Sequence, residues 1–211
     1  MNQFNGIILE GNSNAGKTSV LKSLKKLQAN DDDAERSVVI LSEHYSQVLH
    51  RVNGEITALN RREHLSLLQD RTLMLTKLNE WARELGQVQR SKGIFFILER
   101  FHLNHRVAFS DSEVNEMKQI EAQLLAMGAK CVLLTISPDY IENRLRSRHP
   151  EEWIGKSEAE IKMACDLFSK QQEEFRQQAT DSVIPTIEIN TDTGDWDSCA
   201  RQIYFFENKI K

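Results

Sequence analysis

The stretch Gly11-Asn12-Ser13-Asn14-Ala15-Gly16-Lys17-Thr18 decides the fold, because it matches the pattern G-x-x-x-x-G-K-[ST] of phosphate-binding loops. An apolar run at residues 6–9 precedes it and is typical of a buried strand. Residues 19–27 follow it and carry apolar side chains at helical spacing. A strand, a glycine loop and a helix are the order that this motif requires. We therefore predict a nucleotide-binding loop; the alternative is an ordinary glycine turn.

The chemistry expected of this loop is that of a polyphosphate site. Its backbone N–H groups and the positive end of the following helix can hold phosphate oxygens. Lys17 would reach the β- and γ-phosphates, and the Thr18 hydroxyl would bind Mg²⁺. The residues expected to contact the nucleotide are Asn12, Ser13, Asn14, Ala15, Gly16, Lys17, Thr18 and Ser19, together with Arg144 farther along the chain.

Composition limits the remaining possibilities. The 211 residues are 40% hydrophobic and 27% charged, which suits a single globular domain over residues 1–211. The net charge of −4 gives no indication of a nucleic-acid or anionic membrane surface. Three cysteines without C-x-x-C spacing fit a reducing compartment, so we expect a cytoplasmic protein. No apolar run approaches the roughly 20 residues of a membrane span.

Apolar runs and helical patterns alternate along the chain. Besides residues 6–9, buried strands are predicted at residues 38–41, 94–98, 131–136 and 186–189, whereas 50–60 reads as loop or broken helix. Helices are predicted between these runs. Their starts are marked by the pairs Asn60–Glu63, Ser110–Glu113 and Ser157–Glu160, and their ends lie near Gly86, Gly128 and His149-Pro150. A last predicted helix includes Ile210. The alternation predicts a three-layer α/β fold of the P-loop NTPase type, with a five-stranded parallel sheet flanked by helices.

Charged side chains follow two of the predicted strands. Glu99 and Arg100 end the strand at 94–98, and Glu43 follows the strand at 38–41. Parallel sheets place ligand sites at the carboxyl ends of their strands. We expect Glu99 to hold Mg²⁺ directly or through water, or else only to cap a helix. Arg100 would bind a substrate or γ-phosphate oxygen, or else form only a surface ion pair. Glu43 would accept the proton of an attacking hydroxyl, bind the acceptor's sugar or the metal, or point to solvent.

Two further groups of charged residues are candidates for substrate contact. Arg144, Arg146 and Arg148 precede His149-Pro150, and an arginine-rich helix end that passes into a loop can act as a lid, here at about 144–156. Arg144 and Arg148 share a helix face that Arg146 does not, so at least one of the three should face solvent. Arg71 interrupts an apolar helix pattern; it would reach the acceptor's base or phosphate, or lie on a solvated face.

Taken together, these segments resemble the deoxynucleoside kinases. Glu10-Gly11-Asn12 with Ala15-Gly16-Lys17-Thr18 resembles their E-G-N-x-x-A-G-K-S loop, and Glu99-Arg100 their E-R-S motif. Glu43 resembles their glutamate after the second strand, and Arg146-Ser147-Arg148 their R-x-R lid. The resemblance implies ATP and Mg²⁺ as cofactors and transfer of the phosphoryl group to a 5′-hydroxyl. It also implies that Glu43 is the base, that Glu99 binds the metal and that Arg146 and Arg148 close over the phosphates. A homodimer is possible by the same resemblance.

Departures from that family leave the acceptor open. Phe101 replaces the serine of E-R-S, and His105-Arg106 replaces an aspartate–arginine pair. Residues 68–71 are instead similar to a helix segment of thymidylate kinases. We therefore expect a kinase that phosphorylates a nucleoside-like small molecule and contacts neither nucleic acid nor membrane. The alternatives are a thymidylate-type nucleoside-monophosphate kinase, a kinase of a non-nucleoside alcohol and a nucleotide-dependent switch.

Overall fold

The structure, a computed structural model, describes residues 3–32, 34, 37–52, 55–84, 93–110, 115–148 and 150–208. Its strands are β1 (Gln3–Glu10), β2 (Ser37–Leu41), β3 (Leu49–Val52), β4 (Glu55–Ala58), β5 (Gly93–Glu99), β6 (Ala129–Thr135) and β7 (Thr186–Asn190). Its helices are α1 (Lys17–Ala29), the short 3₁₀ helix η1 (Glu43–Tyr45), α2 (Arg61–Glu84), α3 (His102–Ala108), α4 (Asn115–Ala126), α5 (Pro138–Arg148), α6 (Pro150–Trp153), α7 (Glu158–Asp181) and α8 (Trp196–Asn208).

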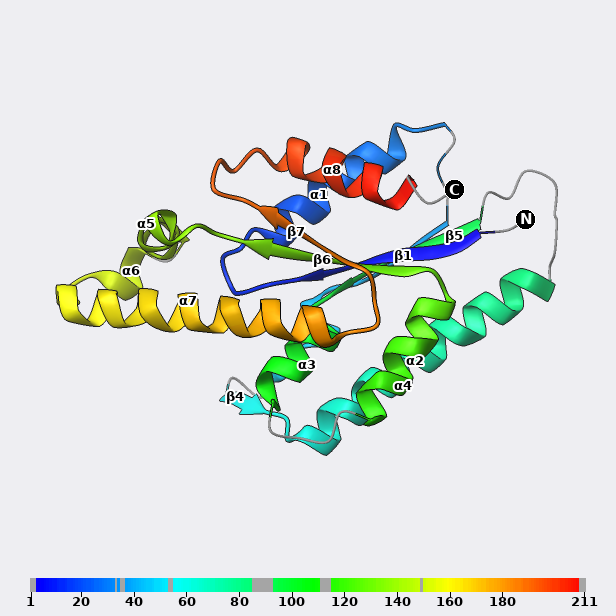
Figure 1. The fold of residues 1–211 in the computed structure, drawn as a ribbon, viewed down its shortest axis with the longest axis horizontal. Coiled ribbons are helices and arrows are strands. Elements are labelled where there is room, and N and C mark those ends of the chain that lie inside the picture. The colour runs from blue at the N-terminus through cyan, green and yellow to red at the C-terminus, as the bar shows by residue number, and fades with distance from the viewer. Residues whose placement is uncertain are drawn as a thin grey trace.

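The central sheet has five parallel strands in the order β2-β5-β1-β6-β7. Helices α1 and α8 cover one face, and α2, α3, α4 and α7 cover the other (Figure 1). The predicted three-layer α/β fold with a five-stranded parallel sheet is therefore confirmed. Because all five strands run the same way, their carboxyl ends gather at one edge of the sheet.

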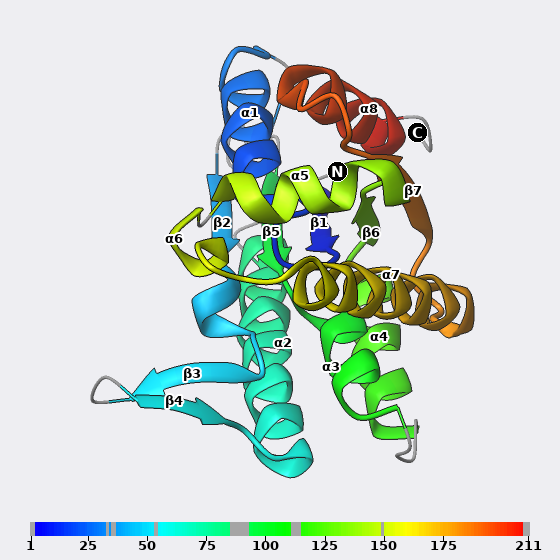
Figure 2. The same ribbon diagram turned by 90° about the vertical axis from the view of Figure 1, so that its left-hand side faces the viewer.

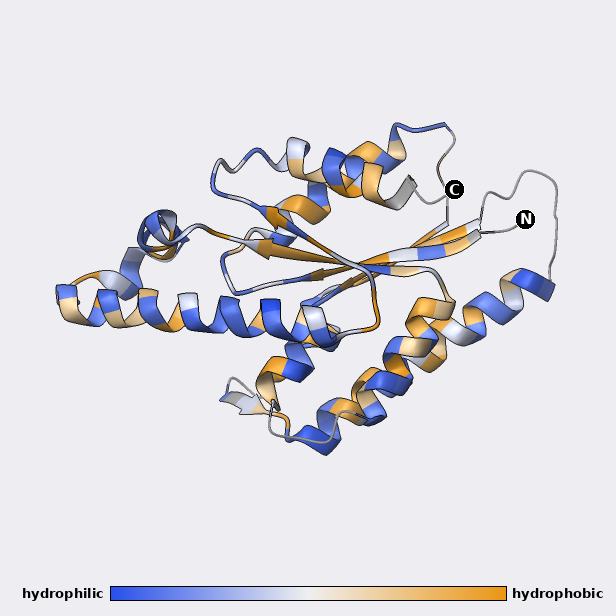
Figure 3. Cartoon of the chain, viewed as in Figure 1, coloured by the Kyte–Doolittle hydropathy of each residue, from blue (hydrophilic) through white to orange (hydrophobic). Residues whose placement is uncertain are grey.

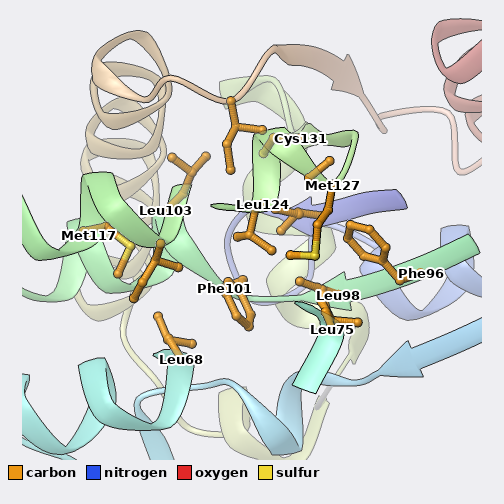
Figure 4. Packing of buried hydrophobic residues seen from close by; sticks show 14 of the residues in the cluster. Leu68, Leu75, Phe96, Leu98, Phe101, Leu103, Met117, Leu124, Met127 and Cys131 are labelled. Carbon is orange, nitrogen blue, oxygen red and sulfur yellow. The ribbon is translucent and has the colours of Figure 1, made fainter. Parts of the chain in front are cut away.

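Alternation along the central strands produces two cores, one on each face of the sheet. Ile8 and Leu98 pack against α2 and α4, whereas Ile7, Leu9 and Ile97 pack against α1 and α8. Apolar residues accordingly line the sheet and the inner faces of the helices (Figure 3). In the core on the face covered by α2 and α4, the side chains of these two helices pack against those of β5 and α3 (Figure 4). All seven residues of β5 are buried, as expected of a central strand covered on both faces.

The strand predicted as buried at residues 38–41 is an edge strand. β2 pairs with β5 alone, and its first two residues are exposed while the rest are half-buried. A short apolar run predicts a strand but not its place in the sheet, because burial depends on which strands pair on either side.

The segment predicted as loop or broken helix contains an antiparallel hairpin. Strand β3 pairs with β4, with Leu49 opposite Ala58 and Val52 opposite Glu55. The hairpin extends from the body of the protein near the start of α2 (Figure 2). Asn53-Gly54 lies outside the described residues, but this dipeptide is a strong hairpin signal that the weak periodicity around it concealed.

Helix starts agree with the capping residues wherever the structure describes them. Asn60 and Glu63 exchange hydrogen bonds of 2.9 and 3.0 Å at the start of α2. Ser157 and Glu160 form a reciprocal capping box at the start of α7. The pair Ser110–Glu113 and the predicted stops at Gly86 and His149 are not fully described, and Ile210 also lies outside the described residues. Helix α3 was not predicted, because seven residues are too few to show a periodicity.

Among the described residues, the structure contains no helix of the length and apolar character needed to cross a membrane.

Candidate nucleotide and phosphoryl-transfer site

The loop between β1 and α1 needs glycine at two positions. Gly11 has φ +125°, and a Cβ there would lie 2.4 Å from the carbonyl oxygen of Leu134. Gly16 has φ +91°, and its Cβ would lie 2.4 Å from the ring of Trp196. Gly16 is also the N-cap of α1 and supplies no side-chain cap, so the first N–H groups of this helix are available to an anion.

Lys17 is buried inside this loop. Its Nζ donates to the carbonyl oxygens of Gly11, at 3.0 Å, and Asn12, at 2.8 Å. Burial, and then the nearby Arg100 guanidinium, lower the pKa of Lys17 to about 7. The carboxylates of Glu43, Glu10 and Glu99 act against this lowering, and a polyphosphate in the loop would add further negative charge beside Lys17.

The loop is supported from behind by two long-range contacts. Asn12 Nδ2 donates to the carbonyl oxygen of Phe168 in α7 at 2.8 Å. One turn later in α7, Gln172 bonds both backbone groups of Ile136, which follows β6, at 2.8 and 2.9 Å. Helix α7 therefore fixes both the loop and the end of β6.

Glu10, the last residue of β1, holds the start of α3. Its Oε1 accepts from the backbone N–H groups of Phe101 and Leu103, each at 2.9 Å. Full burial raises the pKa of Glu10 to about 7, against the lowering effect of these hydrogen bonds and of Lys17. This residue links the strand before the loop to the helix after β5.

Glu43 and Arg100 form a half-buried ion pair beside the loop. Arg100 Nε lies 2.7 Å from Glu43 Oε2, and Arg100 Nη2 donates to Ser13 Oγ at 2.7 Å. Arg100 adopts φ +52°, a left-handed conformation that is uncommon for a side chain of its size and turns the chain from β5 into α3. The guanidinium thus joins a carboxylate after β2 to the phosphate-binding loop after β1.

Glu99 fits the position of a metal-site carboxylate. It is 2% exposed; its Oε2 accepts from the Glu43 N–H at 3.3 Å, and its Oε1 has no hydrogen-bond partner. Burial is the main cause that raises the pKa of Glu99. Within the described part of the chain, no group of three or more His, Cys, Asp or Glu side chains could hold a metal ion. Such a set is not needed for Mg²⁺, which is usually held by one or two protein oxygens together with phosphate and water; Glu99 and Thr18 suit that role.

Helix α5 runs across the carboxyl ends of the strands (Figure 2). Two of its three arginines reach the loop. Arg148 Nη1 donates to Asn14 Oδ1 at 2.6 Å, and Arg144 Nη1 reaches the Asn14 carbonyl oxygen at 3.5 Å. Arg144 Nη2 also donates to the carbonyl oxygen of Thr191 at 2.6 Å. Its guanidinium lies over the ring of Trp196, 5.4 Å from the centroid.

Arg146, predicted to close over the phosphates, lies elsewhere in this structure. It pairs with Glu142 at 2.8 Å and with Glu158 at 3.5 Å, away from the loop. The reason is the helical spacing, which places it on a different face from Arg144 and Arg148.

A cavity of about 360 Å³ joins these parts. Its lining residues are Asn14, Gly16, Lys17, Thr18, Ser19, Glu43, Arg144, Arg148 and Trp196. The loop, Arg144, Arg148 and Glu43 therefore line one cavity, and Arg100 and Glu99 contact Glu43.

Arg71 and Arg106 do not line the cavity, and they differ in their bonding partners. Arg71 is half-buried on α2, does not line the cavity, and makes no hydrogen bond or ion pair with another described side chain. Arg106, at the position of the kinases' aspartate–arginine pair, is bound to Glu121 by contacts of 2.6 and 2.9 Å. Because both partners are buried, this guanidinium is committed to the interior.

Trp196 is the cavity residue that the sequence did not indicate. It begins α8, packs against Gly16 and lies under Arg144. No local pattern marks it, because its contacts come from segments far away in the chain.

These features define a three-layer α/β fold in which the first strand is followed by a loop with the sequence pattern of phosphate-binding loops. No protein-family model and no curated protein sequence matches the chain. Among solved structures, it is similar to the YorR protein of Bacillus subtilis in complex with phosphorylated GDP, with a TM-score of 0.58 and 20% identity over 96% of this chain and 95% of that one. A protein of Chloroflexus aurantiacus for which kinase activity has been suggested aligns over 99% of this chain and 98% of its own, at 16% identity and a TM-score of 0.48.

Proposed function

We propose that this chain is an ATP-dependent kinase that transfers the γ-phosphoryl group to a hydroxyl of a nucleoside-like small molecule. The observation that carries the proposal is the link Glu43–Arg100–Ser13, which attaches a carboxylate to the rim of a phosphate-binding loop. A carboxylate held in this place can accept the proton of a hydroxyl that attacks the γ-phosphate. Phosphoryl transfer to a hydroxyl needs such a proton acceptor.

The residues divide the work as follows. Glu43 accepts the proton of the attacking hydroxyl, and Arg100 holds Glu43 in orientation. Lys17 and the first N–H groups of α1 bind phosphate oxygens, and Arg144 and Arg148 neutralise charge that develops during transfer. Mg²⁺ held at Thr18 and Glu99 would supply further charge neutralisation at the phosphates.

A second candidate function rests on Arg71. A half-buried arginine without an ionic partner among the described residues suits an acceptor that carries its own phosphate. This observation favours a nucleoside-monophosphate kinase of the thymidylate type over a kinase of a phosphate-free alcohol. A nucleotide-dependent switch is disfavoured, because it would require an aspartate-based second motif and a residue that positions water. The strand end carries Glu99 instead, and arginines of α5 border the cavity.

The test is ADP release from ATP and Mg²⁺ with a panel of nucleosides, nucleoside monophosphates and small alcohols. Stimulation by nucleosides supports the first proposal, stimulation by monophosphates alone supports the second, and acceptor-independent turnover supports the switch. Lys17→Ala should abolish transfer, whereas Lys22→Ala, on the exposed face of α1, should not. Glu43→Gln with unchanged turnover at saturating acceptor would remove Glu43 as the base.

A further inference from the structure

The segment that carries Glu43 is fixed to Glu99 at both ends. At its start, the Glu43 N–H donates to Glu99 Oε2. At its end, the Ser46 hydroxyl donates to the backbone carbonyl oxygen of Glu99, and Ser46 is fully buried. The turn between them is closed by the Gln47 N–H, which donates to the Glu43 carbonyl oxygen at 2.8 Å.

A buried histidine pair reaches this segment from the other side. His64 of α2 places Nε2 2.7 Å from the Ser46 carbonyl oxygen and Nδ1 2.9 Å from Nδ1 of His105 in α3. The planes of the two rings are 15° apart. The centroid of the Phe109 ring lies 5.0 Å from the centroid of His105 and 6.1 Å from that of His64. His64 is fully buried and His105 is 4% exposed, so these rings do not offer an edge to a ligand.

The partners determine where the protons lie. A carbonyl oxygen only accepts, so His64 Nε2 donates to Ser46. With one proton on each ring, His64 Nδ1 must accept, and His105 Nδ1 must donate to it. Burial lowers the pKa of His105 to about 3, which keeps that ring neutral. The hydrogen bonds therefore run in one direction, from His105 through His64 to Ser46.

We propose that His64 is a positioning residue for Glu43, held in the required tautomer by His105. This inference rests on the proposed function, in which Glu43 is the base. Burying an imidazole costs free energy of desolvation, which hydrogen bonds to its nitrogens offset only in part. Two apolar side chains would fill the same space without that desolvation cost. What the imidazoles add is a directed bond to the segment beside Glu99, which limits where the Glu43 carboxylate can lie relative to the phosphate-binding loop.

Two substitutions separate this role from simple packing. Gln places its amide nitrogen as many bonds from Cα as Nε2 of histidine, so His64→Gln keeps the donor to Ser46. Asn places its nitrogen as many bonds from Cα as Nδ1, so His64→Asn loses that donor. We expect His64→Asn to lower kcat by roughly 10- to 100-fold with an unchanged KM for ATP, since small displacements of a catalytic group cost about that much. We expect His64→Gln to keep kcat within about threefold of wild type.

Two measurements on the full chain judge the inference whether or not an acceptor is found. Hydrogen exchange of the Ser46 and Gln47 amides should be faster in His64→Asn and close to wild type in His64→Gln. Nitrogen-15 NMR of the wild-type imidazoles should show the proton on Nε2 of His64 and on Nδ1 of His105. Equal kcat in both variants, unchanged exchange in His64→Asn, or the opposite tautomers would overturn the inference. Absence of acceptor-dependent turnover in the wild type, with exchange and tautomers as expected, would instead overturn the proposed function and leave only the positioning of the segment supported.

Discussion

The buried pair of Arg106 and Glu121 offers a prediction with a clear magnitude. Arg106 Nε and Nη2 lie 2.6 and 2.9 Å from the two oxygens of Glu121, and the residues are 4% and 0% exposed. Arg106→Met would leave a fully buried carboxylate without its cation. Breaking such a pair costs about 3–5 kcal/mol, and in a chain of this size each kcal/mol lowers Tm by about 2–4 °C, so we expect Tm to fall by about 6–20 °C.

The matched double variant separates structure from function. Arg106→Met with Glu121→Leu removes both charges, and such replacements are often neutral for stability. We expect this variant to recover most of the lost Tm in calorimetry and to keep the wild-type KM for the acceptor, because the Arg106 guanidinium bonds Glu121 and Gln178 in the interior. A single variant that loses less than about 1 kcal/mol, or a stable double variant with a greatly raised acceptor KM, would refute the reasoning.

Three further predictions concern the phosphate-binding loop. Because its pKa is lowered to about 7, Lys17 is mostly neutral at pH 8. Nucleotide binding at pH 8 should therefore take up close to one proton, and the affinity should weaken as pH rises further. Titration calorimetry in buffers of different ionisation enthalpy measures the proton uptake, and binding without it would contradict the prediction. Nucleotide binding should change the fluorescence of Trp196, and the change should vanish in Trp196→Leu but persist in Trp81→Leu, whose indole lies exposed on α2. Gly16→Ala should lower the free energy of unfolding by about 1–3 kcal/mol in urea titrations and weaken nucleotide binding at least tenfold. The reason is that Gly16 has a positive φ and Trp196 occupies the space of the new Cβ. Wild-type affinity would show that the loop tolerates the methyl group.

Local patterns were enough to predict the layers of the fold. The loop at residues 11–18, the strand at 94–98 and the capping pair Ser157–Glu160 each act over a few neighbouring residues, so their signals are present in any short window of sequence. The hairpin and α3 were missed because both are short and stabilised by contacts outside themselves. Helix α3 depends on Glu10, more than ninety positions earlier, for the hydrogen bonds at its start.

The predicted site depended on which side chains the fold brings together. Strand-end placement singled out Glu43, Glu99 and Arg100, and the structure brings the three into contact, because the carboxyl ends of parallel strands meet at one edge. The bond from Arg100 to Ser13 and the place of Trp196 depend on the order of strands and helices, which the sequence does not display. The separation of Arg146 from Arg144 and Arg148 was predictable, because helical spacing alone places it on a different face.

The two contacts that α7 makes, through Phe168 to the loop and through Gln172 to the residue after β6, bear on how the cavity can change shape. They lie four residues apart on one helix, so the loop and the end of β6 cannot move apart without losing at least one of these hydrogen-bonded contacts. Helix α5 is held in turn, because Ile141 packs against Phe168 and Arg148 bonds Asn14 of the loop. Moving α5 away from the loop would break these contacts. We therefore expect Arg144 and Arg148 to reach bound phosphates by side-chain movement, without a large displacement of the helix.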